Sequence, residues 1–399
     1  MARGEFIALI AMMFATIAFS TDAMLPGLPE IAAELTPDAP NRAGLIVNMF
    51  ILGLGFGTFL AGPLSDAFGR KVIVYAGAVL YITGSALAWA AQSLELVLAA
   101  RVIQGLGAAG PRIVSLAIIR DLFVGREMAR IMSIAMMFFM IVPAIAPMLG
   151  AGIIALAGWR AIFGAFVVFS IICTAWLSLR LPETLAPENV RPLRWSKMRA
   201  AVGEMFANPI VRLSIFVQTV TMTTLFGTLT NVQQIYDQSF GRGDTFHFWF
   251  GAVALASGGA SLLNAAIVTR FGMRRLVTAA LTVQIALSAV MLVLSQAGAP
   301  GAFALFVAWQ LGLFCMAGFT IGNLNAIAMQ PMGHIAGMAA SVIGAVATVV
   351  SAILAVPIAL LFDGTPVPLV GTVLVLATLG SLLMRQMGRI EAEDAKQTA

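Results

Sequence analysis

Long apolar runs recur along almost the whole chain. Each is about twenty residues long, the length at which a helix crosses the hydrocarbon core of a bilayer. Twelve runs can be placed, near 6–26, 42–62, 71–91, 95–119, 131–155, 160–179, 209–231, 246–269, 275–296, 301–326, 337–361 and 367–386. A helix satisfies its backbone polar groups within one segment, which lipid requires. The sequence therefore predicts an all-α membrane protein with twelve transmembrane helices.

Composition argues against a soluble protein. Of the 399 residues, 60% are hydrophobic and only 10% are charged, whereas about 25% are charged in average soluble domains. The two cysteines, Cys173 and Cys315, lie inside apolar runs and form neither a disulfide nor a metal-binding pattern. We expect a lipid bilayer as the surrounding medium, and no nucleic-acid partner.

Basic residues are unevenly distributed between the two sides of the predicted membrane. If successive loops lie on alternate sides of the membrane, eighteen of the 23 lysines and arginines fall on one side. Only Arg42, Arg160 and Arg242 fall on the other side. Arg101 and Arg112 lie inside the fourth run. Because cytoplasmic loops collect positive charge, both termini are predicted to be cytoplasmic.

The chain also reads as two similar halves. The longest polar connection, 181–208, carries Pro182, Pro187 and Pro192 and separates residues 1–180 from 209–399. Phe68-Gly69-Arg70-Lys71 follows the second run, and Phe271-Gly272-Met273-Arg274-Arg275 follows the eighth. Duplicated six-helix halves are a known transporter plan. We therefore expect two pseudo-symmetric six-helix bundles joined by a cytoplasmic linker.

The loop after the second run carries the most specific motif. Residues 62–71, with Gly62, Asp66, Gly69, Arg70 and Lys71, resemble the loop 2–3 signature of the major facilitator superfamily. Glycine permits a tight turn, and an acid can offset neighbouring cations. The resemblance implies a conformational-switch loop; the alternative is a plain turn with cytoplasmic positive charges. The second copy has Thr269 where Asp66 stands.

Further motifs narrow the resemblance. Residues 98–109, around Arg101, resemble the fourth-helix signature of proton-coupled members, and Pro143, Pro147 and Gly150 resemble the drug:proton antiporter motif, with Ala151 replacing its usual second glycine. Segments 21–29, 119–123, 158–163, 181–185 and 334–337 are similar to the Bcr/CflA branch. That branch exports bicyclomycin- and chloramphenicol-type drugs.

The resemblance implies a monomeric, proton-coupled exporter of small antimicrobial compounds in the bacterial inner membrane, with the proton gradient as its energy source and no cofactor. The alternative is a proton-coupled transporter of an endogenous metabolite. Residues 105–110 satisfy the dinucleotide pattern G-x-G-x-x-G, but they lie in an apolar helical run, where small residues favour close helix packing. We find neither an ATP-binding P-loop nor a catalytic constellation, so an enzyme is not expected.

Asp22, Arg101 and Arg112 are the charged residues that lie well inside the predicted spans. A charge at the bilayer centre costs about 2.5–3.5 kcal/mol, so such residues are functional candidates. We expect Asp22 to carry the proton and Arg101 to act as its electrostatic switch. The alternatives are a structural ion pair between them, or an Asp22 that lies at the membrane interface. Arg112 shares the helix face of Arg101 and is a candidate for contact with an anionic group of the substrate, for contact with cavity water, or for snorkelling to the cytoplasm.

Substrate contacts are expected from adaptable apolar side chains and from polar groups inside spans. The superfamily plan implied by the resemblance places runs seven and ten at the cavity. For any single apolar residue, a lipid-facing or core position is the alternative. The candidates besides Arg112 are Met136, Phe139, Gln218, Asn231, Trp309, Gln310, Phe314 and Asn323.

Overall fold

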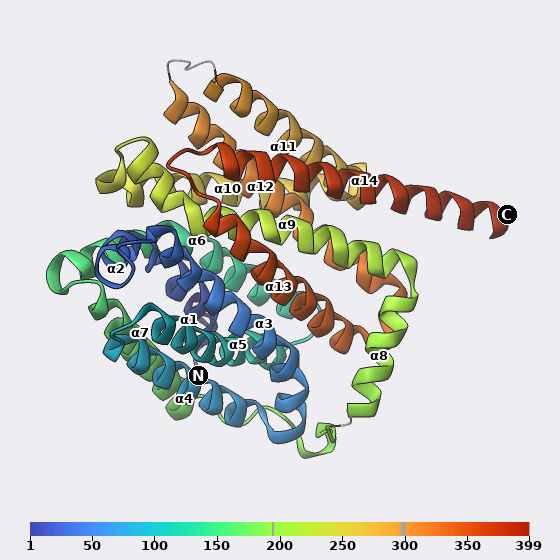
Figure 1. The fold of residues 1–399 in the computed structure, drawn as a ribbon. Helices are drawn as coiled ribbons and strands as arrows, with labels where there is room; N and C mark the ends of the chain where they lie inside the picture. The colour runs from blue at the N-terminus through green and yellow to red at the C-terminus, as the bar shows by residue number, and fades with distance from the viewer. Residues whose placement is uncertain (194, 297–300, 399) are drawn as a thin grey trace. The chain divides into compact units, whose positions relative to one another are not determined.

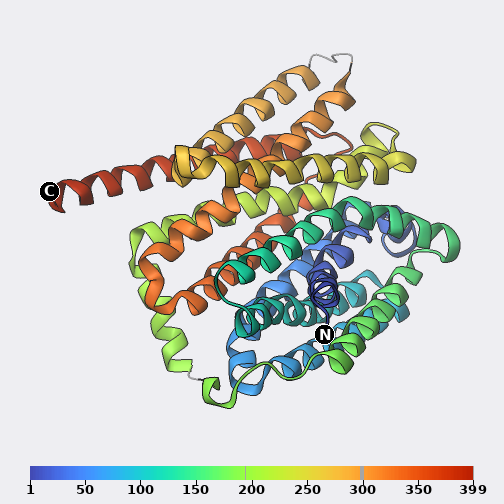
Figure 2. The same ribbon diagram turned by 180° about the vertical axis from the view of Figure 1, so that it is seen from behind.

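The structure is a computed structural model. It describes residues 1–193, 195–296 and 301–398, apart from the side chains of 129, 136, 138–140, 195, 197, 296, 336 and 394–398. Helices joined by short connections make up most of the described chain in both views (Figures 1 and 2). Its long helices are α1 Arg3–Asp22, α3 Leu45–Phe68, α4 Arg70–Ala90, α5 Leu94–Leu122, α6 Gly125–Ala157, α7 Arg160–Arg180, α9 Pro209–Gln234, α10 Phe246–Phe271, α11 Met273–Gln296, α12 Ala302–Met329, α13 Ala336–Leu360 and α14 Val367–Thr398.

These helices have the lengths that a bilayer requires. Within the described residues, eleven helical stretches are long and apolar enough to cross a membrane, and the described apolar part of α6 is Ile141–Ala157. The prediction of an all-α, multi-pass membrane protein is therefore confirmed. The helix bounds lie within a few residues of the predicted runs for most of the chain.

The chain divides into two compact units. The first comprises Met1–Arg194 and Asp244–Gly251, and the second comprises Trp195–Gly243 and Ala252–Ala399. The narrower division into bundles 1–180 and 209–399 stays a prediction. Inside the expected linker, residues Trp195–Ala207 form a helix, α8. Its buried residues Met198, Ala201 and Met205 share one face, which explains why this polar segment is helical.

Small residues allow α5 to lie close to both α3 and α4. A Cβ on Gly105 would collide with the Phe50 carbonyl oxygen of α3, and one on Gly107 would collide with the Gly77 carbonyl oxygen of α4. The G-x-G-x-x-G run is therefore a helix-packing surface, as predicted, and not the glycine turn of a nucleotide-binding βαβ unit.

The first helix ends earlier than its apolar run. The run was predicted to continue to residue 26, but α1 ends at Asp22, followed by the short helices η1 Leu25–Gly27 and α2 Leu28–Leu35. Pro26 has no N–H with which to bond the Asp22 carbonyl, so the α-helical ladder stops there. Asp22 is thus the last helical residue of α1. It is nevertheless buried, with 5% of its surface exposed.

The second unit is organised around α9. This helix packs against α12, α13 and α14. It is buried along most of its length despite many threonine and glutamine side chains. Most of its threonine hydroxyls bond a carbonyl three or four residues earlier, which satisfies them inside the helix.

Candidate functional site

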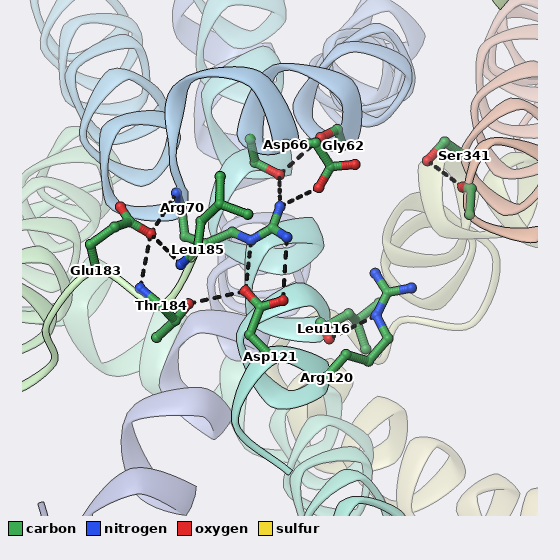
Figure 3. A network of polar contacts seen from close by, with 12 residues as sticks. Gly62, Asp66, Arg70, Leu116, Arg120, Asp121, Glu183, Thr184, Leu185 and Ser341 are labelled. Atoms are coloured by element: carbon green, nitrogen blue, oxygen red, sulfur yellow. Dashed lines mark hydrogen bonds and ion pairs between the residues drawn. The ribbon is translucent and has the colours of Figure 1, made fainter. Parts of the chain in front are cut away.

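The predicted switch loop is a dense polar cluster at the turn between α3 and α4. Gly69 forms the turn with φ of 104°, a left-handed conformation that favours glycine. Arg70, 6% exposed, donates from Nε to Asp121 Oδ2 at 2.9 Å and from Nη1 to Ser65 Oγ at 3.0 Å. It also pairs with Asp66. Figure 3 shows the Arg70 guanidinium between these two acids.

A second carboxylate, Glu183, covers the start of α4. Its two oxygens accept the backbone N–H groups of Arg70 and Lys71, both at 3.0 Å. They also accept the N–H groups of Thr184 and Leu185 (Figure 3). Burial by itself would raise the pKa of Glu183, but these four donors together hold the pKa below its ordinary value. Glu183 is therefore a charged cap at a helix N-terminus.

This loop cluster ties four segments of the first unit together. Lys71 Nζ bonds the Leu181 carbonyl at 2.9 Å, and Thr184 Oγ1 donates to Asp121 at 3.1 Å. The Gly62 carbonyl accepts the Ser65 hydroxyl. Asp66, Arg70 and Lys71 were predicted from the motif, whereas Asp121, Glu183 and Thr184 were not predicted as part of this loop. Those residues were noted only as marks of a family branch, and no spacing in the sequence joins them to the loop.

A second polar cluster lies inside the unit around Arg101, which is completely buried. Its Nη2 donates to the Ser20 carbonyl of α1 at 3.0 Å, and its Nε donates to the Ile46 carbonyl of α3 at 3.2 Å. Its Nη1 donates to Gln104 Oε1 at 2.6 Å, and its guanidinium lies 4.4 Å from the centre of the Phe50 ring. One side chain on α5 thereby holds α1 and α3.

The cluster continues across α4. Gln104 Nε2 donates to Ser85 Oγ at 2.8 Å, and the Ser20 and Tyr81 hydroxyls lie 2.5 Å apart. All four side chains are buried. Ser20, Tyr81 and Ser85 were not predicted as site residues, because a single serine or tyrosine in an apolar run carries no periodic signal.

Asp22 does not pair with Arg101 in this structure. No ion pair or hydrogen bond to its carboxylate is found among the described residues, and Arg101 instead reaches the carbonyl of Ser20, two residues earlier. The alternative of a structural Asp22–Arg101 pair therefore has no support in this conformation.

The predicted antiporter motif lies beside Asp22. Pro143 and Pro147 are both inside α6, and Gly150 follows them. A Cβ on Gly150 would collide with the carbonyl oxygen of Ala23, the residue after Asp22. The structure thus brings the α6 motif against the end of α1.

The substrate candidates lie in several environments. Gln218, Asn231, Trp309, Gln310 and Asn323 are buried, and Phe314 is half-buried. Trp309 Nε1 donates to Ser288 of α11, Asn231 to its own helix and Ile358 of α13, and Asn323 to Asn264 of α10. Gln310 accepts the Tyr236 hydroxyl, while the Gln218 side-chain oxygen has no partner among described residues. The side chains of Met136 and Phe139 lie outside the description. Arg112 is half-buried.

A chain of membrane-spanning helices in two units, with a charged loop cluster and a buried arginine, has the architecture of a membrane transporter. Its sequence matches the Major Facilitator Superfamily over residues 8–384, and the protein belongs to this superfamily. It is a transporter of small molecules and not an enzyme.

Named relatives are similar over most of the chain. The bicyclomycin resistance protein homolog of Haemophilus influenzae is 28% identical over 365 residues, which are 89% of this chain and 88% of that protein. Multidrug resistance protein MdtL of Vibrio parahaemolyticus is 27% identical over 81% of this chain and 80% of its own. A solved D-xylose-proton symporter superposes with a TM-score of 0.77 at 15% identity, covering 95% and 96% of the two chains. That likeness shows the fold alone.

Proposed function

We propose that the protein is a drug:proton antiporter that exports small, largely apolar antimicrobial compounds by alternating access. It lies in the bacterial inner membrane as a monomer, with both termini in the cytoplasm. The observation that carries the proposal is Asp22, a buried acid without an ionic partner among the described residues. The names of the relatives, bicyclomycin resistance and multidrug resistance, support the drug substrate.

Asp22 is the proton carrier in this proposal. A carboxyl group in apolar surroundings favours its neutral form, while a neighbouring guanidinium favours the charged form. Arg101 is fixed at the same end of α1 through the Ser20 carbonyl. A small movement of α1 that brings Asp22 toward Arg101 favours release of the proton, and the reverse movement favours uptake. Gly150, packed on Ala23, transmits movement of α6 to the same turn.

The loop cluster is the conformational latch of the proposal. Arg70 is held by Asp66 and Asp121, and the start of α4 is held by Glu183. Breaking these contacts releases the ends of α3, α4 and α5 together. Drug contacts are proposed for Arg112, Met136, Phe139, Gln218, Asn231, Trp309, Gln310, Phe314 and Asn323.

The direct test is drug-driven proton movement in proteoliposomes. The full-length protein is reconstituted, a pH gradient is imposed, and an internal pH dye is followed as chloramphenicol or bicyclomycin is added. Antiport collapses the gradient for the wild-type protein, and Asp22→Asn abolishes the drug-driven change. Asp38→Asn, an exposed loop acid, is the matched control and behaves as wild type. Full proton coupling in Asp22→Asn contradicts the role of Asp22, and drug movement along with the protons indicates symport instead.

A further inference from the structure

Two arginines on one face of α5 have opposite surroundings. Arg101 and Arg112 are eleven residues apart, close to three helical turns and about 16 Å along the axis. Arg101 makes three hydrogen bonds and a ring contact. Arg112 makes no hydrogen bond or ion pair with any described residue, although it is half-buried. A cation inside a span normally has a partner, so the missing partner of Arg112 requires an explanation.

Snorkelling does not supply the partner. Long side chains near helix ends reach the polar interface. Arg112 is ten residues from the last residue of α5, Leu122, which places it about 15 Å from that end. This is farther than an arginine side chain extends. The guanidinium therefore does not reach the end of α5.

No acid of the first unit is found in contact with Arg112 among the described residues. Asp66 and Asp121 pair with Arg70, Glu5 pairs with Arg180, and Glu127 pairs with Arg3. Asp22 is level with Arg101, because Arg101 bonds the Ser20 carbonyl. Arg112 lies about 16 Å further along α5.

The acids in the candidate spans of the second unit lie near the span ends: Asp237 in Pro209–Ser239, and Glu391 and Glu393 in Val367–Glu393, where Glu391 pairs with Arg274. The sequences of α9, α10, α11, α12 and α13 contain no aspartate or glutamate. Its drug-contact candidates are the neutral residues Gln218, Asn231, Gln310 and Asn323. No acid that balances Arg112 is found among the described residues.

We propose that Arg112 binds an acidic group, such as a carboxylate, on the transported compound. The inference rests on the proposed transport function and names the substrate class, an apolar body that carries an anion. A guanidinium binds a carboxylate through two parallel hydrogen bonds. The attraction is stronger in a site of low dielectric than in water. Binding the anion thus offsets the cost of keeping Arg112 in the membrane, and a cationic compound is repelled.

The test compares matched compounds that differ in charge. Affinities of the full-length protein in nanodiscs are measured for neutral chloramphenicol, for its carboxylate-bearing succinate ester, and for the cation tetraphenylphosphonium. The wild type is expected to bind the succinate roughly tenfold tighter than chloramphenicol, the scale of one hydrogen-bonded charge contact. It is expected to bind the cation most weakly.

Variants assign the preference to Arg112. Arg112→Gln is expected to remove the preference for the succinate, while Arg112→Lys retains part of the preference. Arg120→Gln, an exposed arginine on the same helix, keeps it all. Equal wild-type affinities for the two compounds, or a preference that survives in Arg112→Gln, overturns the inference. If Arg112→Gln does not fold, the wild-type comparison and Arg112→Lys still decide.

Failure of this inference is separable from failure of the proposed function. Proton movement driven by neutral chloramphenicol tests Asp22 and does not involve the charge of Arg112. If the wild type couples chloramphenicol to protons but shows no preference for the anion, only the inference about Arg112 is contradicted. A wild type that prefers the anion but moves no protons sinks the antiport proposal and leaves the Arg112 site standing.

Discussion

Arg70 of α4 and Asp121 of α5 form an ion pair of 2.9 Å between Nε and Oδ2, fifty-one residues apart in the chain. The same guanidinium reaches Ser65 and Asp66 at the end of α3. A lysine ammonium cannot reproduce this fork. We expect Arg70→Lys to lower the free energy of unfolding by about 2 kcal/mol, less than the roughly 3–5 kcal/mol of a buried pair broken outright. Detergent-induced unfolding followed by tryptophan fluorescence measures the change.

The second half of the chain supplies the control for this prediction. Arg274, one residue after the position that corresponds to Arg70, lies at the start of α11 and pairs with Glu391 at 2.5 Å, but both side chains are 41% exposed. Exposed pairs contribute at most about 1 kcal/mol. Arg274→Lys should therefore change stability by less than that amount. Equal losses in the two variants would show that the burial of Arg70 does not matter.

The cap made by Glu183 predicts a pH dependence of stability. Because its folded-state pKa is lowered, its contribution is fully present above the unfolded value of about 4.3 and is lost as pH falls through the folded value. Glu183→Gln should melt below the wild type at pH 7, and the difference should shrink below about pH 4. Melting curves from pH 3 to pH 7 measure this.

The matched control for the cap is Glu188→Gln, a change of an exposed acid in the same loop. Its melting curve should follow that of the wild type at every pH. A Glu183→Gln variant whose deficit grows on acidification would contradict the cap.

The fold was largely predictable because lipid imposes a single length on every span. The runs starting at 160, 209 and 246 begin at the same residues as α7, α9 and α10. The clusters were less predictable. Glu183 meets Arg70 across 113 residues, and Arg101 binds backbone carbonyls, which every residue type carries. Neither contact leaves a pattern of residue types in the sequence.

The structure shows a correspondence between the two halves of the chain that comparison of their sequences does not show. Ser85 of α4 accepts from Gln104 of α5, and Ser288, 203 residues later on α11, accepts from Trp309 of α12. Arg101 lies one turn before Gln104 in the first half, and Phe306 lies one turn before Trp309 in the second half. Because an aromatic ring replaces the polar groups, sequence comparison of the halves hides the match. Among the described residues, the buried charge is present in the first half only.

Gly150 offers a test of the contact between α6 and the end of α1. An added methyl group must displace the Ala23 carbonyl, so Gly150→Ala should shift the turn after Asp22. We expect drug-driven proton movement to fall at least roughly tenfold, since a displacement of about 1 Å can cost a hundredfold in a positioned site. Gly152→Ala is the control, because nothing lies within 4 Å of its added Cβ. Wild-type activity in Gly150→Ala would show that this contact does not govern coupling.

Two variants of Arg101 distinguish a structural role of this side chain from an electrostatic role. Its three donors go to Ser20, Ile46 and Gln104, so both Arg101→Lys and Arg101→Gln should lower the free energy of unfolding, by about 3 kcal/mol. Only lysine keeps the positive charge near Asp22. We therefore expect folded Arg101→Lys protein to retain part of the chloramphenicol-driven proton movement and Arg101→Gln to lose it, measured per mole of folded transporter in proteoliposomes. Equal loss in both variants would mean that Arg101 acts through the geometry of α1 and α3 and not through its charge.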